Sequence, residues 1–160
     1  MSLISSSSKG LPGIPDARVA ILTSKWHAEH VNNVADKCEQ ILVQQEAVVQ
    51  RHEVPGTYEF PYAVRVLKES DSELVAVVCI GIVLKGETEH YEMILNSCSV
   101  GLTKASLEYD VIVINGIIPA TDRKQIVARA STDQFNKGIE LARAAVEAIA
   151  WTNKVRGRRS

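Results

Sequence analysis

Apolar residues recur along this chain at two spacings, which predict two kinds of element. Short runs rich in β-branched residues predict strands at residues 19–23, 47–52, 74–82 and 111–118. Between these runs the apolar positions fall three or four residues apart, which predicts helices. The inward faces of three of them carry Val31, Val34, Cys38, Ile41 and Leu42; then Tyr91, Ile94, Leu95, Cys98, Leu102 and Ala105; and then Ile139, Ala142, Val146 and Ile149 in a last helix at residues 136–152. A further helix is expected at residues 59–68, with Pro61 in its first turn.

The strand at residues 74–80 is apolar throughout, so both of its faces must be buried. That requires helices above and below a mainly parallel sheet. The pattern therefore predicts an α/β fold, a doubly wound three-layer sandwich around a central, mainly parallel four-stranded sheet with flavodoxin-like topology. In such sheets ligands bind at the carboxyl ends of the strands, which is where candidate residues are sought.

Composition divides the chain into three segments. Residues 1–16 contain four consecutive serines and several glycines and prolines, which predicts a flexible N-terminal arm. Residues 17–153 form a single domain, since 160 residues with 46% hydrophobic content suffice for one core. Residues 154–160 form a short basic tail.

Charge and cysteine usage exclude several classes of function. A net charge of -1 gives no basic field for nucleic acid, and no apolar run is long enough to span a membrane. The three cysteines, in apolar stretches without CxxC spacing, indicate reduced core thiols and a cytoplasmic protein. The four histidines lack metal-site spacing, so no metal is expected. Walker A, GxGxxG and GxSxG motifs are absent.

Two predicted strands lead into loops with candidate ligand-binding residues. Trp26 follows the first strand, where its indole either stacks on a planar ligand or lies in the core. Glu59 follows the second strand, close to a helix start, where its carboxylate either favours the positive end of the helix or accepts hydrogen bonds from ligand hydroxyls.

The loop after the third strand is the most informative stretch of the sequence. Gly86 and Thr88 precede a helix, and such a loop presents backbone N–H groups to an anion. His90 opens that helix and either transfers protons near neutral pH or has a structural role. Downstream, Arg129 on a short helix and Lys137 near the start of the last helix are either surface cations or parts of a phosphate clamp.

Three motifs together resemble the signature regions of the lumazine synthase family. They are VPGTYEFP at 54–61, GIVLKGETEHYE at 81–92 and the RAS and NKG segments between Arg129 and Gly138. The resemblance covers residues 17–152. It implies a cofactor-free condensation of 5-amino-6-ribitylaminouracil with 3,4-dihydroxy-2-butanone 4-phosphate, which gives 6,7-dimethyl-8-ribityllumazine, phosphate and water in the penultimate step of riboflavin biosynthesis.

The resemblance also implies a role for each matching position. Trp26 stacks on the pyrimidine ring, and the ribityl chain is held by Thr57, Tyr58 and Glu59. The ring pocket and phosphate loop, both substrate-binding, comprise Val83, Leu84, Lys85, Gly86, Glu87 and Thr88. The catalytic set is His90 for proton transfer, with Arg129 and Lys137 at the phosphate from the adjacent subunit.

The family further implies a homo-oligomer, whether a pentamer, a decamer or a 60-subunit shell, with riboflavin synthase as a possible further partner. Asn115 departs from the family, because many relatives have a phenylalanine there that covers the bound ring from the neighbouring subunit. Trp26 replaces the commoner phenylalanine. Two alternatives follow: a flavin- or lumazine-binding paralogue with little or no synthase activity, and an unrelated flavodoxin-like or regulatory module.

Overall fold

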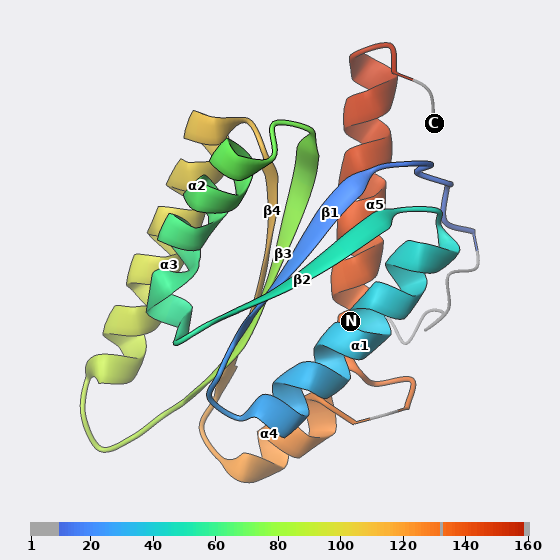
Figure 1. The fold of residues 1–160 in the computed structure, drawn as a ribbon. Coiled ribbons are helices and arrows are strands. Elements are labelled where there is room, and N and C mark those ends of the chain that lie inside the picture. Colours follow the sequence, from blue (N-terminus) through green and yellow to red (C-terminus); the bar gives the residue numbers. More distant parts are fainter. Residues whose placement is uncertain (1–9, 132, 159–160) are drawn as a thin grey trace.

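A four-stranded parallel sheet forms the centre of the computed structural model, which describes residues 10–131 and 133–158 (Figure 1). The strand order is β2-β1-β3-β4, and every neighbouring pair is parallel. The strands are β1 (Arg18–Ser24), β2 (Val48–Val54), β3 (Leu74–Leu84) and β4 (Ile112–Ala120). Each lies within two residues, at either end, of the run predicted from β-branched residues.

Helices cover both faces of this sheet (Figure 1). They are α1 (Ala28–Gln44), the 3-10 helix η1 (Thr57–Glu59), α2 (Phe60–Ser70), α3 (His90–Tyr109), the short α4 (Arg123–Arg129) and α5 (Lys137–Val155). Helices α1 and α5 pack together on one face, and α2 and α3 on the other. The predicted α/β three-layer fold with a four-stranded parallel sheet is confirmed.

Strand β1 shows why two core layers form. Its alternate residues Val19 and Ile21 face the α1–α5 side, whereas Ala20 and Leu22 face the α2–α3 side, and all four are buried. A central strand covered on both faces leaves no position for a polar side chain over most of its length. Thr23 and Ser24, at its last two positions, are therefore unusual in being polar and buried.

At both ends of the predicted domain, the ordered structure extends past the boundary that the sequence predicts. Within the segment expected to be a flexible arm, Ile14 is fully buried, and its backbone N–H donates to the Gln45 carbonyl at 2.9 Å. At the other end, α5 runs to Val155, into the predicted tail, and Arg156 forms an ion pair with Asp110 at 2.8 Å. Among the described residues, no helix is both long and apolar enough to cross a membrane.

The three cysteines are free and buried, as their apolar surroundings predict. Burial raises the pKa of all three thiols, to about 12 for Cys38, so thiolate is scarce at neutral pH. We expect Ellman's reagent to modify the folded protein at least about 100-fold more slowly than the protein in guanidinium. Rapid labelling of one thiol in the folded protein would contradict this placement.

Candidate active site

The carboxyl ends of β1, β2 and β3 bring together the loops that the sequence singles out (Figure 1). Trp26 follows β1, η1 follows β2, and residues 85–89 follow β3. Backbone hydrogen bonds tie these loops to neighbouring strands: Lys25 N–H donates to the Val54 carbonyl at 3.2 Å, and Lys85 N–H donates to the Ala120 carbonyl at 2.8 Å. Three segments far apart in sequence thus meet at one edge of the sheet, the edge formed by the carboxyl ends of its strands.

Trp26 lies at this edge with 72% of its surface exposed. The core interpretation of this residue is therefore excluded within the single chain, and the indole is available to stack on a planar ligand. The next residue, His27, has left-handed backbone (φ 59°, ψ 40°) and caps α1. This sharp turn takes the chain from the end of β1 directly into the helix and leaves Trp26 outside the core.

The η1 segment combines one buried and two exposed candidates. Thr57 is buried, and its carbonyl accepts a hydrogen bond from the Cys98 thiol of α3 at 3.2 Å. Tyr58 and Glu59 are exposed. Glu59 stands at the start of α2 but makes no side-chain capping hydrogen bond, so its carboxylate is not engaged at the helix end. A carboxylate in that position can accept hydrogen bonds from ligand hydroxyls.

Gly81 on β3 forms part of the floor beneath η1. An added Cβ there would stand 2.5 Å from the Thr57 methyl and 2.9 Å from the Ser24 hydroxyl oxygen. Only glycine lets η1 approach the sheet this closely. Farther along β3, Val83 and Leu84 are partly exposed, as expected of residues that line a pocket.

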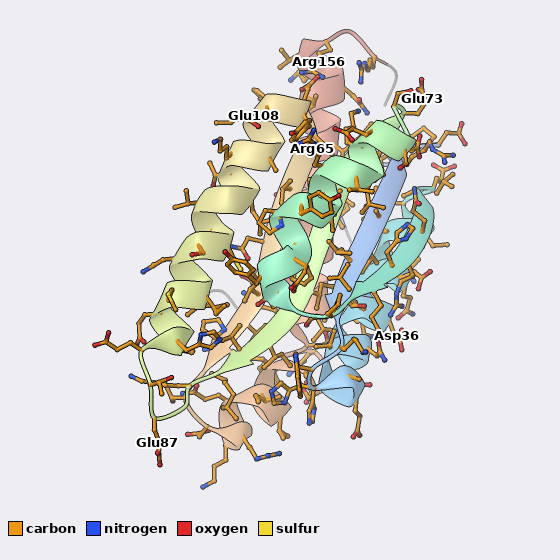
Figure 2. All side chains as sticks on the ribbon, turned by 60° about the vertical axis from the view of Figure 1, so that its left-hand side comes forward. Asp36, Arg65, Glu73, Glu87, Glu108 and Arg156 are labelled. Atoms are coloured by element: carbon orange, nitrogen blue, oxygen red, sulfur yellow. The ribbon has the colours of Figure 1, made fainter. Side chains whose placement is uncertain are left out.

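The loop after β3 leads into α3 as predicted, with His90 as the first residue of the helix. The His90 backbone N–H donates to the Thr88 hydroxyl at 3.4 Å, and residues 85–90, 92 and 93 line a hollow on the surface. Figure 2 shows Glu87 at the outer tip of this loop. The side chain of Lys85 forms an ion pair with Glu92 at 3.5 Å.

Charge at this hollow is unfavourable to a phosphate within a single chain. Three carboxylates, from Glu87, Glu89 and Glu92, line it, against one lysine and His90. Backbone N–H groups attract an anion, but like charges within a few ångströms repel it. A phosphate bound here needs a further cation.

Arg129 and Lys137 do not line this hollow in the single chain. Arg129 is exposed at the end of α4 and donates from Nη1 to the Pro119 carbonyl at 2.8 Å. Lys137 is the first residue of α5, and its ammonium pairs with Glu140 at 3.0 Å. The structure thus leaves the guanidinium of Arg129 on the surface, near the carboxyl end of β4.

The NKG segment has a structural explanation as well. Asn136 is buried, caps α5 by accepting from the Gly138 N–H at 2.7 Å, and donates to the carbonyls of Ser131 and Asn33. Gly138 lies against the α1 backbone at Val34, where a side chain would collide. Two of its three residues therefore fix α5 on α1, whereas the third, Lys137, pairs with Glu140.

Asn115 lies away from the other candidates. It is the fourth residue of β4, five positions before the carboxyl end, and its Nδ2 reaches the Ser99 hydroxyl of α3 at 3.5 Å. It belongs to a small hollow between α3 and the outer side of β4, which is an edge strand. The single chain does not bring Asn115 together with Trp26.

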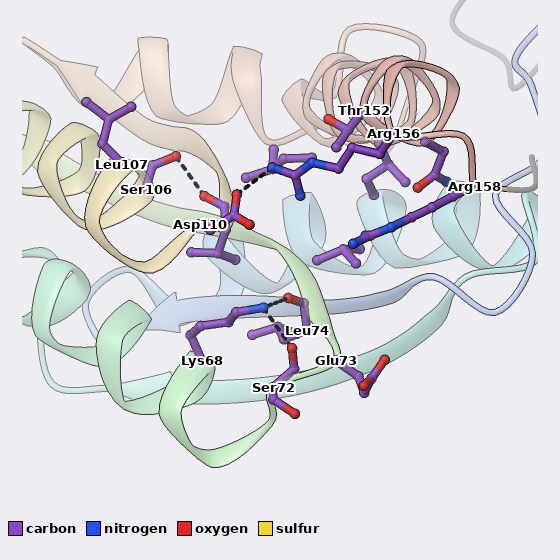
Figure 3. A pocket seen from close by; sticks show the side chains of 15 residues that line it. Lys68, Ser72, Glu73, Leu74, Ser106, Leu107, Asp110, Thr152, Arg156 and Arg158 are labelled. Atoms are coloured by element: carbon purple, nitrogen blue, oxygen red, sulfur yellow. Dashed lines mark hydrogen bonds and ion pairs between the residues drawn. The ribbon is translucent and has the colours of Figure 1, made fainter.

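A second cavity of about 590 Å³ lies at the opposite, amino end of β3 and β4 (Figure 3). Its principal charged groups are already paired. Lys68 donates to the Ser72 and Leu74 carbonyls at 2.8 Å each, and Arg156 pairs with Asp110. Lys68 thus ties the end of α2 to the start of β3, and Arg156 ties α5 to the end of α3, which are structural roles.

Sequence reasoning missed three residues of the candidate site: Ser24, Gly81 and Cys98. Each supports Thr57 from below or behind. The one signal available was a serine at the end of a largely apolar strand, because a buried polar side chain calls for a partner. Gly81 and Cys98 depend on tertiary contacts with η1, which the sequence does not display.

Comparison with known proteins finds a single family over nearly the whole described chain. Residues 16–153 match the family model of 6,7-dimethyl-8-ribityllumazine synthase. A protein of that name from Stenotrophomonas maltophilia (strain R551-3) is 34% identical over 83% of this chain and 87% of its own length. Proteins of the same name from Cytophaga hutchinsonii and Coxiella burnetii (strain CbuG_Q212) are 30% and 34% identical over 93% and 86% of this chain, and over 95% and 93% of their own lengths.

Proposed function

The chain belongs to the 6,7-dimethyl-8-ribityllumazine synthase family, and we propose that its site condenses 5-amino-6-ribitylaminouracil with 3,4-dihydroxy-2-butanone 4-phosphate. The observation that carries this proposal is the meeting of the family motifs at 54–61 and 81–92 on one edge of the sheet. The protein is then a transferase of riboflavin biosynthesis. The chemistry needs only proton transfers and alignment of two reactants, for which side chains suffice.

The site residues divide by substrate in this proposal. Trp26, Val83 and Leu84 hold the pyrimidine ring, and the η1 residues Thr57, Tyr58 and Glu59 hold its ribityl chain. Lys85, Gly86, Glu87 and Thr88 form the phosphate loop, while Arg129 and Lys137 supply the missing positive charge from a neighbouring copy. The acidic surroundings of the loop support this last assignment, since one chain alone provides too little positive charge.

The reaction then proceeds in three stages. The 5-amino group attacks the ketone carbon, and water leaves as a C=N bond forms. Loss of a proton from the adjacent carbon expels phosphate, and the second amine closes the ring with loss of water. His90 is placed at the phosphate loop and the start of α3, where it can take and return these protons.

Replacement of His90 by alanine is expected to slow the reaction without abolishing it. Alignment of two bound reactants can supply on the order of 7 kcal/mol or more, whereas one general acid-base group contributes about 10² to 10⁴ in rate. We therefore expect kcat to fall by about 100-fold, with both KM values little changed. Single-turnover mixing measures the rate of the chemical steps. An unchanged rate in the variant would show that His90 does not transfer protons in the reaction.

We propose that the active form is a homo-oligomer. Met93, Val100 and Leu107 recur every seven residues on α3, with 59%, 69% and 80% of their surfaces exposed. Large apolar side chains exposed in one stripe mark an interaction surface. Asn115, beside α3 on the free edge strand β4, would then face a neighbouring site. Pentamer, decamer and 60-subunit shell all satisfy this, and sedimentation distinguishes them.

The product is the substrate of riboflavin synthase, so contact with that enzyme is a further part of the proposal. A cytoplasmic location is proposed as well, because three buried free thiols suit a reducing compartment.

The test of the proposed function is to mix purified protein with both substrates and follow absorbance and fluorescence of the lumazine. Product formation supports the synthase. Binding without turnover would instead support the flavin- or lumazine-binding alternative, which the exposed Trp26 and the polar Asn115 favour.

A further inference from the structure

Ser24, the last residue of β1, carries a buried hydroxyl with no hydrogen-bond partner anywhere in residues 10–131 and 133–158. Only 2% of the residue is exposed. Leaving such a group unpaired costs about 1–3 kcal/mol, and proteins rarely retain it without a reason. Ser24 lies two residues before Trp26, at the edge of the sheet where the candidate site is found.

Thr57 is a candidate partner, because both side chains border the same space above Gly81. A Cβ atom added to Gly81 would lie 2.5 Å from the Thr57 methyl, 2.9 Å from the Ser24 hydroxyl oxygen and 3.3 Å from the Phe60 ring. These three side chains therefore border one small space above Gly81. The Thr57 backbone is held in place, because its carbonyl accepts from the Cys98 thiol. Its side chain can still turn about the Cα–Cβ bond, which exchanges methyl and hydroxyl between staggered positions.

The neighbouring residue shows that burial alone does not leave a hydroxyl unpaired. Thr23 is also buried, but its Oγ1 donates to the His52 carbonyl at 3.3 Å. Thr23 faces the α1–α5 side of the sheet, away from Gly81 and η1. Of the two buried hydroxyls, Thr23 and Ser24, the unpaired one is thus that of Ser24, which faces Thr57.

We propose that Ser24 is a positioning residue for Thr57 in the bound enzyme. Side-chain rotation lets the Ser24 hydroxyl donate to Thr57 Oγ1, whose own proton then donates to the ribityl-bearing pyrimidine substrate. Linked hydrogen bonds of this kind polarise one another and fix the geometry of the last donor. The inference rests on the proposed function, since it takes the pyrimidine substrate as the ligand of Thr57.

The test is a double-mutant cycle on the KM of each substrate, with wild type, Ser24→Ala, Thr57→Val and the double variant. We expect Ser24→Ala to raise the KM for the pyrimidine substrate about 3- to 10-fold. The KM for the phosphate substrate should stay unchanged, and the melting temperature should not fall. The double variant should match Thr57→Val alone, because Ser24 acts through Thr57.

Thr23→Val is the matched control, as it removes a paired hydroxyl one residue away. It should lower the melting temperature and leave both KM values unchanged. Wild-type kinetics in Ser24→Ala, or additive effects in the double variant, would overturn the inference. If the wild type forms no product, the proposed reaction fails instead, and the same cycle is then read from calorimetric titration with the pyrimidine substrate.

Discussion

The Arg129→Ala enzyme is expected to bind the phosphate substrate about 10- to 150-fold more weakly than wild type, since hydrogen bonds to a charged group contribute about 1.5–3 kcal/mol. The hollow after β3 holds three carboxylates, so loss of the one added guanidinium leaves the phosphate among like charges. Steady-state kinetics with varied phosphate substrate measures the change as a higher KM for that substrate. The KM for the pyrimidine substrate should move little.

Lys124→Ala is a suitable control for this prediction, because Lys124 is exposed on the same short helix. It removes an equal charge without touching Arg129 and should leave the KM for phosphate substrate near the wild-type value. Arg129→Ala also loses the hydrogen bond to the Pro119 carbonyl, so melting temperatures must accompany the kinetics. If the Arg129→Ala enzyme is folded and its KM for the phosphate substrate is unchanged, Arg129 does not anchor the phosphate.

Charging the exposed stripe of α3 is expected to have the second large effect. In a closed ring each copy repeats the substitution, so Val100→Asp with Leu107→Asp places carboxylates in every interface. Buried unpaired charges are strongly unfavourable, and the oligomer should dissociate. If Arg129 acts only across the interface, activity should fall by at least about 100-fold, as for loss of a charged anchor and its alignment.

Sedimentation of the double variant reports dissociation, and circular dichroism reports whether the monomer stays folded. Val155→Asp, at the far end of α5, is the control, because it charges a similarly exposed valine off the α3 stripe. A folded monomer with wild-type turnover would show that one chain holds the complete site.

Much of the fold followed from the sequence because burial acts on every residue of a strand or helix. The apolar run of β3 required two covering layers, and both are present. The burial of Ile14 and the end of α5 were not predicted, because each depends on a few contacts rather than on a repeated pattern. An isolated isoleucine in a glycine- and proline-rich segment shows no periodicity, and Lys154 and Arg156 look like a solvated tail until Asp110 is placed beside them.

The candidate site was only partly predictable. Loops at the carboxyl ends of strands could be located from the strand pattern, and they share an edge as expected. The exposure of Trp26 could not be predicted from the sequence, because a tryptophan beside polar neighbours can either lie in the core or stack on a ligand. The arrangement of Ser24, Thr57 and Gly81 depends on the depth at which η1 settles on the sheet.

A pocket shared between copies is the central claim, and subunit mixing tests it most directly. His90→Ala and Arg129→Ala proteins are unfolded together, refolded as mixed oligomers and assayed at fixed total concentration. If the two residues serve one site from different copies, about a quarter of the sites in a random mixture regain both, and activity exceeds that of either variant alone. Activity equal to the mean of the two variants would contradict the account, because each chain would then hold its own complete site.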